Sequence, residues 1–317
     1  MMAMGKPNLE VFADTLLELA RADQNVLAIT SDSRGSGKLS PFGETLPDQI
    51  VEVGIAEQNL VGIAAGMASA GKKVYAVSPA CFLTARSLEQ IKNDVAYSNQ
   101  HVNLIGISAG VSYGALGSTH HSLHDFAVLR TIHNIDIIAP ADNFEAAQAI
   151  RAALNHVRPV YIRFGKWAMP HLHQPGTHFE IGKAITLREG RDVTFVATGE
   201  PTAAAMSAAE LLSAQGISTR VISMHTVKPF DREVLLDAAQ HSRVLITVEE
   251  HSIYGGLGEQ CASALLQAGI FLPFKIVGFP DENTITGHQS DVLAHYGISP
   301  DGLAKTALEL LQVEVQL

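Results

Sequence analysis

The chain has 317 residues, of which 47% are hydrophobic and 17% are charged, and its formal net charge is −10. This length favours two domains, and this composition excludes an intrinsically disordered chain. The negative charge argues against nucleic acid or an anionic membrane surface as a partner. Because the sequence contains neither an apolar leader nor a continuous apolar run of about 18 residues, we expect a cytoplasmic protein.

Cysteine and histidine usage gives no sign of a metal site. The two cysteines, Cys81 and Cys261, are far apart and show no Cys-x-x-Cys spacing, which favours two reduced thiols over a disulfide or a zinc site. The densest histidine group is His171, His173 and His178, in a proline-containing loop without a local acidic or cysteine ligand pattern. We therefore expect no metal ligands in this chain.

Strand and helix patterns alternate along the first half. After an amphipathic helix over 8–22, strands are predicted over 26–30, 73–77, 102–108, 136–139 and 160–163, and helices over 87–98 and 143–154. Asp142 and Glu145 form a capping pair for the last of these helices. The alternation predicts a mostly parallel sheet with helices on both faces, whose ligands gather at the carboxyl ends of the strands.

The second half repeats the same architecture after a connecting segment. Strands are predicted over 193–197, 219–223, 244–248 and 274–278, with helices over 202–215, 231–239, 257–268 and 300–311. We divide the chain into a first domain over 1–175, a linker over 176–185 and a second domain over 186–317. The glycines at 255–258 lack the full phosphate-loop and dinucleotide spacings, which favours a tight strand-to-helix turn.

One carboxylate, Glu57, stands at the head of a stretch, 53–68, that is otherwise almost entirely apolar or small. A helix without a polar face is buried, and a buried carboxylate costs several kcal/mol unless it is neutralised, paired or hydrogen-bonded. Glu57 can satisfy free N–H groups in the first helical turn. Alternatively, it is a catalytic carboxylate whose proton affinity is tuned by burial.

The sequence Gly-Ile-Ala-Glu-Gln over 54–58, followed by a small-residue helix, resembles the glutamate motif of thiamine-diphosphate enzymes of the transketolase group. The resemblance implies that Glu57 contacts N1′ of the cofactor's aminopyrimidine and promotes the imino tautomer that deprotonates thiazolium C2. It also implies that the helix packs against its counterpart in a second subunit. Residues 224–231 and 249–251 resemble the C-terminal domain of the same group.

Two further residues acquire cofactor roles through this resemblance. Phe82 follows a strand and on its own is an ordinary core residue, but it matches the family's phenylalanine that stacks on the aminopyrimidine ring. The family often supplies a second aromatic residue three positions later, where this chain has Ala85. Arg86, the next residue, can offer a guanidinium face instead.

His120 lies in a long glycine-containing loop over 110–124, in the sequence Thr-His-His. Loops of this length within a compact domain are usually functional or mobile. The stretch is similar to the Thr-His-Gln stretch of transketolases, which implies that His120 contacts the substrate and assists proton transfer. The alternative is an ordinary surface histidine. The family's aspartate that reads acceptor stereochemistry is replaced by Leu116.

The resemblance also implies binding sites for the thiamine and for the substrate's anionic group. Asp32 and Ser36 keep the spacing of the family loop that approaches the thiamine and binds substrate phosphate. Arg163 matches the family's phosphate-clamping arginine. A histidine that holds phosphate in the family is replaced by Ser108, and no arginine stands near Asn8. These departures leave a branched sugar, a sulfosugar or an altered phosphate substrate open.

The chain lacks the Gly-Asp-Gly segment through which the family holds Mg²⁺ and the cofactor's diphosphate. The resemblance covers only the second and third domains of a transketolase. It therefore implies the β subunit of a split glycolaldehyde transferase, with thiamine diphosphate and Mg²⁺ shared with a separate diphosphate-binding subunit in an α₂β₂ assembly. A deoxyxylulose-phosphate-synthase-like or 2-oxoacid-dehydrogenase-like β subunit, and a non-catalytic binding partner with this fold, remain the alternatives.

Overall fold

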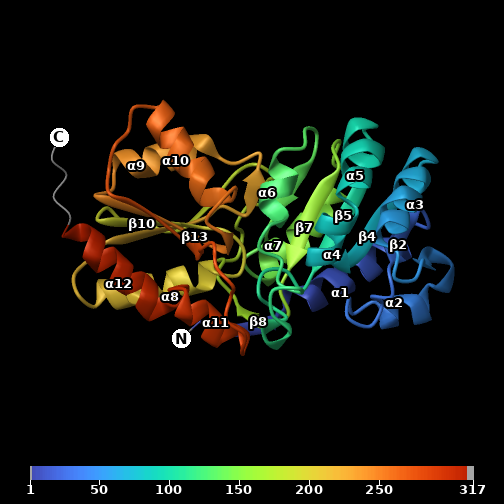
Figure 1. The fold of residues 1–317 in the computed structure, drawn as a ribbon, viewed down its shortest axis with the longest axis horizontal. Coiled ribbons are helices and arrows are strands. Elements are labelled where there is room, and N and C mark those ends of the chain that lie inside the picture. The colour runs from blue at the N-terminus through green and yellow to red at the C-terminus, as the bar shows by residue number, and fades with distance from the viewer. Residues whose placement is uncertain (1, 313–317) are drawn as a thin grey trace.

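A computed structural model describes residues 2–312 and folds them into two α/β domains that lie side by side (Figure 1). Each domain contains one mainly parallel sheet with helices on both faces. The expected fold class is thus confirmed. Within residues 2–312, no helix is both long and apolar enough to cross a membrane.

The first domain is built on a seven-stranded sheet in the order β12-β6-β7-β5-β4-β2-β3. These strands are β2 (Val26–Thr30), β3 (Ile50–Glu52), β4 (Lys73–Pro79), β5 (Val102–Ile107), β6 (Asp136–Ile138), β7 (Val160–Phe164) and β12 (Thr226–Lys228). All neighbouring pairs are parallel except β12 with β6. The carboxyl ends of six strands therefore lie along one edge.

Helices cover both faces of this sheet (Figure 1). One face carries α1 (Asn8–Ala22) and α7 (Asn143–Ala153), and the other carries α3 (Glu57–Ser69), α4 (Ala80–Arg86) and α6 (Asp125–Arg130). The expected helix over 87–98 consists of α5 (Leu88–Gln90) and a π-helix, η2 (Ile91–Tyr97). Shorter elements are α2 (Ser40–Thr45) and the 3₁₀ turns η1 (Pro47–Gln49) and η3 (Gly114–Leu116).

The second domain has a five-stranded sheet in the order β14-β13-β10-β11-β9. Its strands are β9 (Ile185–Arg188), β10 (Val193–Ala197), β11 (Thr219–Ser223), β13 (Val244–Ser252) and β14 (Phe274–Phe279), and only the edge strand β9 is antiparallel. The helices α8 (Thr202–Ser213), α11 (Gln289–His295) and α12 (Pro300–Leu311) cover one face, and α9 (Arg232–Gln240) and α10 (Leu257–Gln267) cover the other.

Two strand pairings tie distant parts of the chain together. β12 comes from the second half of the sequence but pairs with β6, with Thr226 opposite Ile138. Near the amino terminus, β1 (Met4–Pro7) pairs with β8 (Ala168–Pro170), which follows the last parallel strand of the first sheet. If the linker is placed at 176–185, as we propose, β12 crosses the domain boundary and completes the first sheet.

A buried ion-pair cluster fastens the segment after β8 to α7. The side chain of His173 is 1% exposed, and its Nδ1 lies 3.0 Å from Asp142 Oδ2 while its Nε2 lies 3.1 Å from Glu145 Oε1. Asp142 also caps α7 by accepting a hydrogen bond from the Glu145 N–H, as the sequence predicts. Burial lowers the pKa of His173, but the two carboxylates outweigh burial and raise this pKa to about 9.

We expect the stabilisation that this cluster provides to be lost at alkaline pH. Because the pKa of His173 in the folded chain, about 9, lies above its ordinary value of 6.5, its stabilisation is complete below pH 6.5 and is lost as pH rises through 9. Such a shift corresponds to about 3 kcal/mol in the free energy of unfolding. Urea unfolding at pH 6.5 and at about pH 10 should show a larger loss for the wild type than for His173→Gln.

His178, whose side chain is 85% exposed, offers a matched control for His173→Gln. His178→Gln should keep the pH dependence of the wild type. Equal losses of unfolding free energy at alkaline pH in the wild type and in His173→Gln would contradict the role of His173 in this pH dependence.

Candidate active site

The carboxyl edge of the first sheet gathers most of the side chains that the sequence singles out. Asp32 and Ser36 follow β2, Glu57 follows β3, Phe82 and Arg86 lie in the helix after β4, and His120 lies in the loop after β5. The strand order β5-β4-β2-β3 makes these segments neighbours in space. Because parallel sheets generally bind their ligands at this edge, these side chains form a candidate site.

Glu57 is the first residue of α3, and its side chain is 2% exposed. Its Oε2 accepts a hydrogen bond from Arg86 Nη1 at 2.6 Å. A buried carboxylate needs such a partner, because an unpaired charge would carry a large desolvation cost. The side chain of Arg86 is 50% exposed, so a ligand approaching from solvent can meet this ion pair.

Arg86 and His120 both contact the ring of Phe82. The guanidinium carbon of Arg86 lies 5.4 Å from the Phe82 ring centroid. The ring of His120 lies 5.3 Å from that of Phe82, in an edge-on orientation. The structure thus joins four predicted residues in a continuous row: Glu57, Arg86, Phe82 and His120. Phe82 is half-buried, as a ring available to a ligand must be.

The row continues through two residues that the sequence did not single out. The ring of Tyr113 lies 5.4 Å from that of His120, again edge-on. The ammonium nitrogen of Lys166 lies 4.2 Å from the centroid of the Tyr113 ring. Lys166 follows β7, the strand next to β5, so its position at this edge could have been inferred from the sheet order but not from any local motif.

The loop that carries His120 is anchored to the second domain. The buried ring of His121 has Nδ1 3.0 Å from Thr284 Oγ1 and Nε2 3.1 Å from the carbonyl oxygen of Gly114. Burial lowers the pKa of His121. The N–H of Val111 donates a hydrogen bond to Glu250 Oε1 at 2.8 Å. His121 therefore serves as an anchor for the loop, and His120 is the histidine that faces Phe82.

The loop after β2 is shaped by a carboxylate from β3. Glu52 Oε1 accepts hydrogen bonds from the N–H groups of Asp32 at 2.7 Å and Gly54 at 2.9 Å. Asp32 adopts a positive φ of 54° and its side chain is exposed. The hydroxyl of Ser36 donates to the carbonyl oxygen of Ser33 at 3.2 Å. These bonds hold the turn and leave the Asp32 carboxylate facing solvent.

Arg163 has other partners than the expected substrate. Its side chain is 7% exposed, and Nη1 donates to Asp125 Oδ1 at 2.9 Å while Nη2 donates to the carbonyl oxygen of Glu250 at 2.7 Å. The guanidinium also packs 4.4 Å from the centroid of the Phe126 ring. These contacts make Arg163 a tie between the two domains, and its role as a ligand of the substrate's anionic group stays a prediction.

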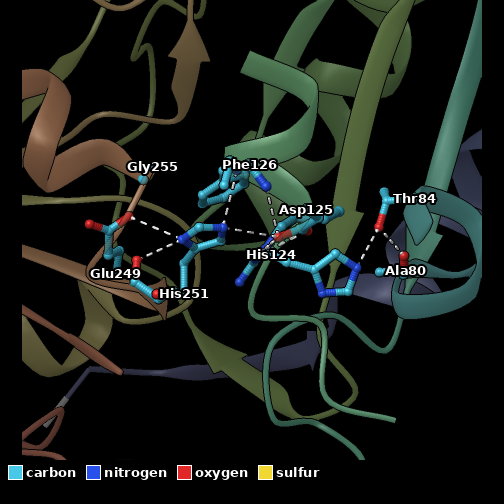
Figure 2. A network of polar contacts seen from close by, with 12 residues as sticks. Ala80, Thr84, His124, Asp125, Phe126, Glu249, His251 and Gly255 are labelled. Carbon is cyan, nitrogen blue, oxygen red and sulfur yellow. Dashed lines mark hydrogen bonds and ion pairs between the residues drawn. The ribbon is translucent and has the colours of Figure 1, made fainter. Parts of the chain in front are cut away.

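Figure 2 shows a polar network that runs from α4 to the second domain. Thr84 Oγ1 lies 3.4 Å from His124 Nε2, and the neighbouring Asp125 lies 3.9 Å from His251 Nε2. Burial lowers the pKa of His251 to about 4, so its ring is neutral at pH 7. On the far side of His251 stands Glu249 (Figure 2). The helix that carries Phe82 and Arg86 is thereby connected to the domain interface.

The glycine cluster at 255–258 forms a strand-to-helix turn. Glu249 accepts hydrogen bonds from the N–H groups of Leu257 at 2.7 Å and Gly258 at 2.8 Å, at the start of α10. A Cβ on Gly256 would lie 2.0 Å from Glu249 Oε2, which explains the need for glycine there. An internal carboxylate therefore occupies the position that a phosphate would take at this helix end.

Comparisons with known proteins identify the family of both domains. The family model for the transketolase pyrimidine-binding domain matches residues 7–170, and the model for the transketolase C-terminal domain matches residues 182–303. One subunit of the apulose-4-phosphate transketolase of Phocaeicola vulgatus is 47% identical over 302 residues, which span 95% of this chain and 96% of that protein. The 6-deoxy-6-sulfo-D-fructose transketolase subunit SqwH of a Clostridium species is 33% identical, over 96% and 94% of the two chains.

A solved structure described as a split gene transketolase in an inactive β4 tetramer superposes with a TM-score of 0.88 and 33% sequence identity. The match covers 98% of this chain and 100% of that one. Both domains and their connection are thus shared over the full length of the related subunit. The chain belongs to the transketolase family, in the split form in which the pyrimidine-binding and C-terminal domains make up a chain of their own.

Proposed function

We propose that the chain is the C-terminal, or β, subunit of a split transketolase that transfers a two-carbon ketol unit from an anionic ketose to an aldose. The row from Glu57 through Arg86 and Phe82 to His120 carries this proposal, because it places a buried carboxylate, an aromatic face and a titratable imidazole together at one sheet edge. The names of two relatives specify a sugar phosphate and a sulfosugar, which supports an anionic substrate.

The residues of this row fit the pyrimidine half of thiamine diphosphate. When bound, that cofactor supplies the nucleophilic carbon that cleaves and forms carbon–carbon bonds. Glu57 would hold a proton at the aminopyrimidine N1′, and Phe82 would pack against the pyrimidine ring with Arg86 beside it. The exposed Asp32 lines the thiamine side of the site. His120 moves protons at the substrate's hydroxyl and carbonyl oxygens.

The diphosphate and Mg²⁺ belong, in this proposal, to a partner subunit. Within residues 2–312, no group of three His, Cys, Asp or Glu side chains is placed to hold a metal ion. Apart from the adjacent residues and backbone of α3 itself, a Cβ on Gly62 or Gly66 would meet no atom of this chain within 4 Å, which leaves room for the same helix of a second copy. The β4 tetramer of the related structure supports such β–β contacts. We propose an α₂β₂ assembly in the cytoplasm.

The first test is thiamine-diphosphate binding and ketol transfer by this chain, alone and mixed with a partner chain that carries Gly-Asp-Gly. We expect activity only in the mixture. Release of CO₂ from pyruvate by the mixture would instead indicate deoxyxylulose-phosphate-synthase-like or 2-oxoacid-dehydrogenase-like chemistry. Failure of the mixture to bind the cofactor at all would contradict the proposal and favour a non-catalytic partner.

A further inference from the structure

The carboxyl edge of the second sheet carries two carboxylates that the proposed function does not use. The strand β10 pairs with β11 on one side and with β13 on the other, so the order of the strands reverses between β10 and β13. Open parallel sheets bind ligands in the crevice outside the strand ends at such a point. Glu200 follows β10, and Glu250 lies near the end of β13. The topology therefore predicts a ligand site beside these two residues.

A cavity of about 230 Å³ lies at this position, lined by Glu200 and Glu250. It is bounded by the first turns of α8 and α11 and by the segment of β8, which lie close to one another (Figure 1). Most of its wall is apolar, from Trp167, Met169, Pro201, Ala204, Leu293 and Ile298. The volume is several times the roughly 30 Å³ of one water molecule but below the about 300 Å³ of the smallest drug-sized pockets. The cavity therefore fits a small organic molecule and excludes a nucleotide.

The polar groups at the cavity wall lack hydrogen-bond donors. Gln289 is 5% exposed, and its Nε2 donates to Glu250 Oε1 at 2.8 Å. Its buried Oε1 has no hydrogen-bond partner within residues 2–312. Glu200 Oε1 accepts long hydrogen bonds from the Gly165 N–H at 3.1 Å and from Asn8 Nδ2 at 3.4 Å, and the same part of the chain gives none to Oε2. A ligand that fits these groups must donate hydrogen bonds.

The electrostatics of the cavity favour a cation. Burial and the nearby carboxylate of Glu250 raise the pKa of Glu200 to about 8, although the Gly165 N–H, the guanidinium of Arg163 and the Asn8 side chain each lower it. Among the described residues that line the cavity there is no Lys or Arg, and His288 is the one lining side chain that can become cationic. A bound ammonium would supply the positive charge that an ionised Glu200 lacks, together with the missing N–H donors.

We propose that this cavity binds a small organic amine in its protonated form. The ammonium lies between Glu200 and Gln289, and the apolar body of the amine packs against Trp167 and the first turns of α8 and α11. An anion of the same shape is rejected, because the two carboxylates repel it. The inference goes beyond the proposed function and does not depend on it, since the cavity lies within this one chain and its occupancy needs neither the partner subunit nor thiamine diphosphate.

The test is isothermal titration calorimetry of the full chain with three probes of similar size and different charge: benzylamine, benzyl alcohol and benzoate. We expect a Kd of about 0.1–1 mM for benzylamine, binding at least about 10-fold weaker for benzyl alcohol, and no measurable binding of benzoate. At pH 7 benzylamine should also displace about one proton per molecule, because it ionises Glu200. Different heats in phosphate and Tris buffers measure this proton release.

Glu200→Gln should weaken benzylamine binding at least about 10-fold and abolish the proton release, while leaving benzyl alcohol binding unchanged. The variant should fold, because the glutamine oxygen can still accept the hydrogen bond from the Gly165 N–H. Glu210→Gln, at an exposed position on the same helix, is the matched control and should bind every probe as the wild type does. Trp167→Ala should weaken benzylamine and benzyl alcohol alike.

Three results would overturn the inference. One is the absence of benzylamine binding by the wild type at concentrations up to about 10 mM. Another is equal affinity for all three probes, which would show that the cavity does not select a cation. The third is wild-type affinity for benzylamine in either Glu200→Gln or Trp167→Ala, which would place the bound amine outside the cavity.

Discussion

Replacement of Glu57 by glutamine is expected to lower kcat for ketol transfer by about 10²- to 10⁴-fold, the contribution typical of a positioned proton-transfer group. Glutamine has nearly the same shape and can still accept the hydrogen bond from Arg86, but it cannot transfer a proton to or from N1′. Because Arg86 is half exposed, water can solvate its charge when the ion pair is lost. Folding should therefore be retained, as the thermal unfolding midpoint and the far-UV circular dichroism spectrum can show.

Glu89→Gln offers a matched control, since Glu89 is an exposed carboxylate on the nearby helix α5. It should leave kcat and stability unchanged. A Glu57→Gln variant with full activity would remove Glu57 from the mechanism. A variant that is inactive because it unfolds would be recognised by its lowered midpoint, in which case kcat would be compared at a temperature where both proteins are folded.

Replacement of Arg163 by methionine is expected to lower the free energy of unfolding by about 3–5 kcal/mol, because removing one partner of a buried ion pair leaves the other charge uncompensated. The stranded charge is that of Asp125, which would keep only the hydrogen bonds from the Tyr161 hydroxyl and the Phe126 N–H. The Glu250 carbonyl oxygen would also lose its donor. Urea unfolding of the isolated chain measures this change.

Arg191→Met is the control for Arg163→Met. Arg191 is exposed, so its replacement should change the unfolding free energy by less than about 0.5 kcal/mol. Adding Asp125→Asn to Arg163→Met should recover part of the loss, because the double variant no longer buries a lone charge. Wild-type stability in Arg163→Met would contradict the role of Arg163 as a tie between domains.

Regular elements of this fold were predictable because their signals are local. The helix over 8–22 and the strands over 26–30, 193–197 and 219–223 match α1, β2, β10 and β11 residue for residue. The short strands β1, β8 and β12 could not be predicted, because each forms its backbone hydrogen bonds with a strand far away in the sequence. The π-helical continuation of α5 likewise has no distinct sequence period.

The site was predictable to the extent that sheet topology determines it. Glu57, Phe82 and His120 each follow a strand of one parallel sheet, so their common edge follows from the alternation of strands and helices. The contacts of Arg163 were not predictable in the same way, because one of its partners, the Glu250 carbonyl oxygen, comes from the second domain. Lys166 is a single lysine after a strand, and only the three-dimensional contact with Tyr113 distinguishes it from other surface lysines.

The position of β12 has a consequence for how a gene encoding this chain can be divided. A break between the two domains would put β12 and β6 on separate chains, and the edge of β6 (Asp136–Ile138) that faces away from β7 would depend on a second chain for its partner strand. Such open sheet edges invite pairing with other molecules and aggregation. Keeping both domains in one chain therefore keeps this edge of the first sheet paired.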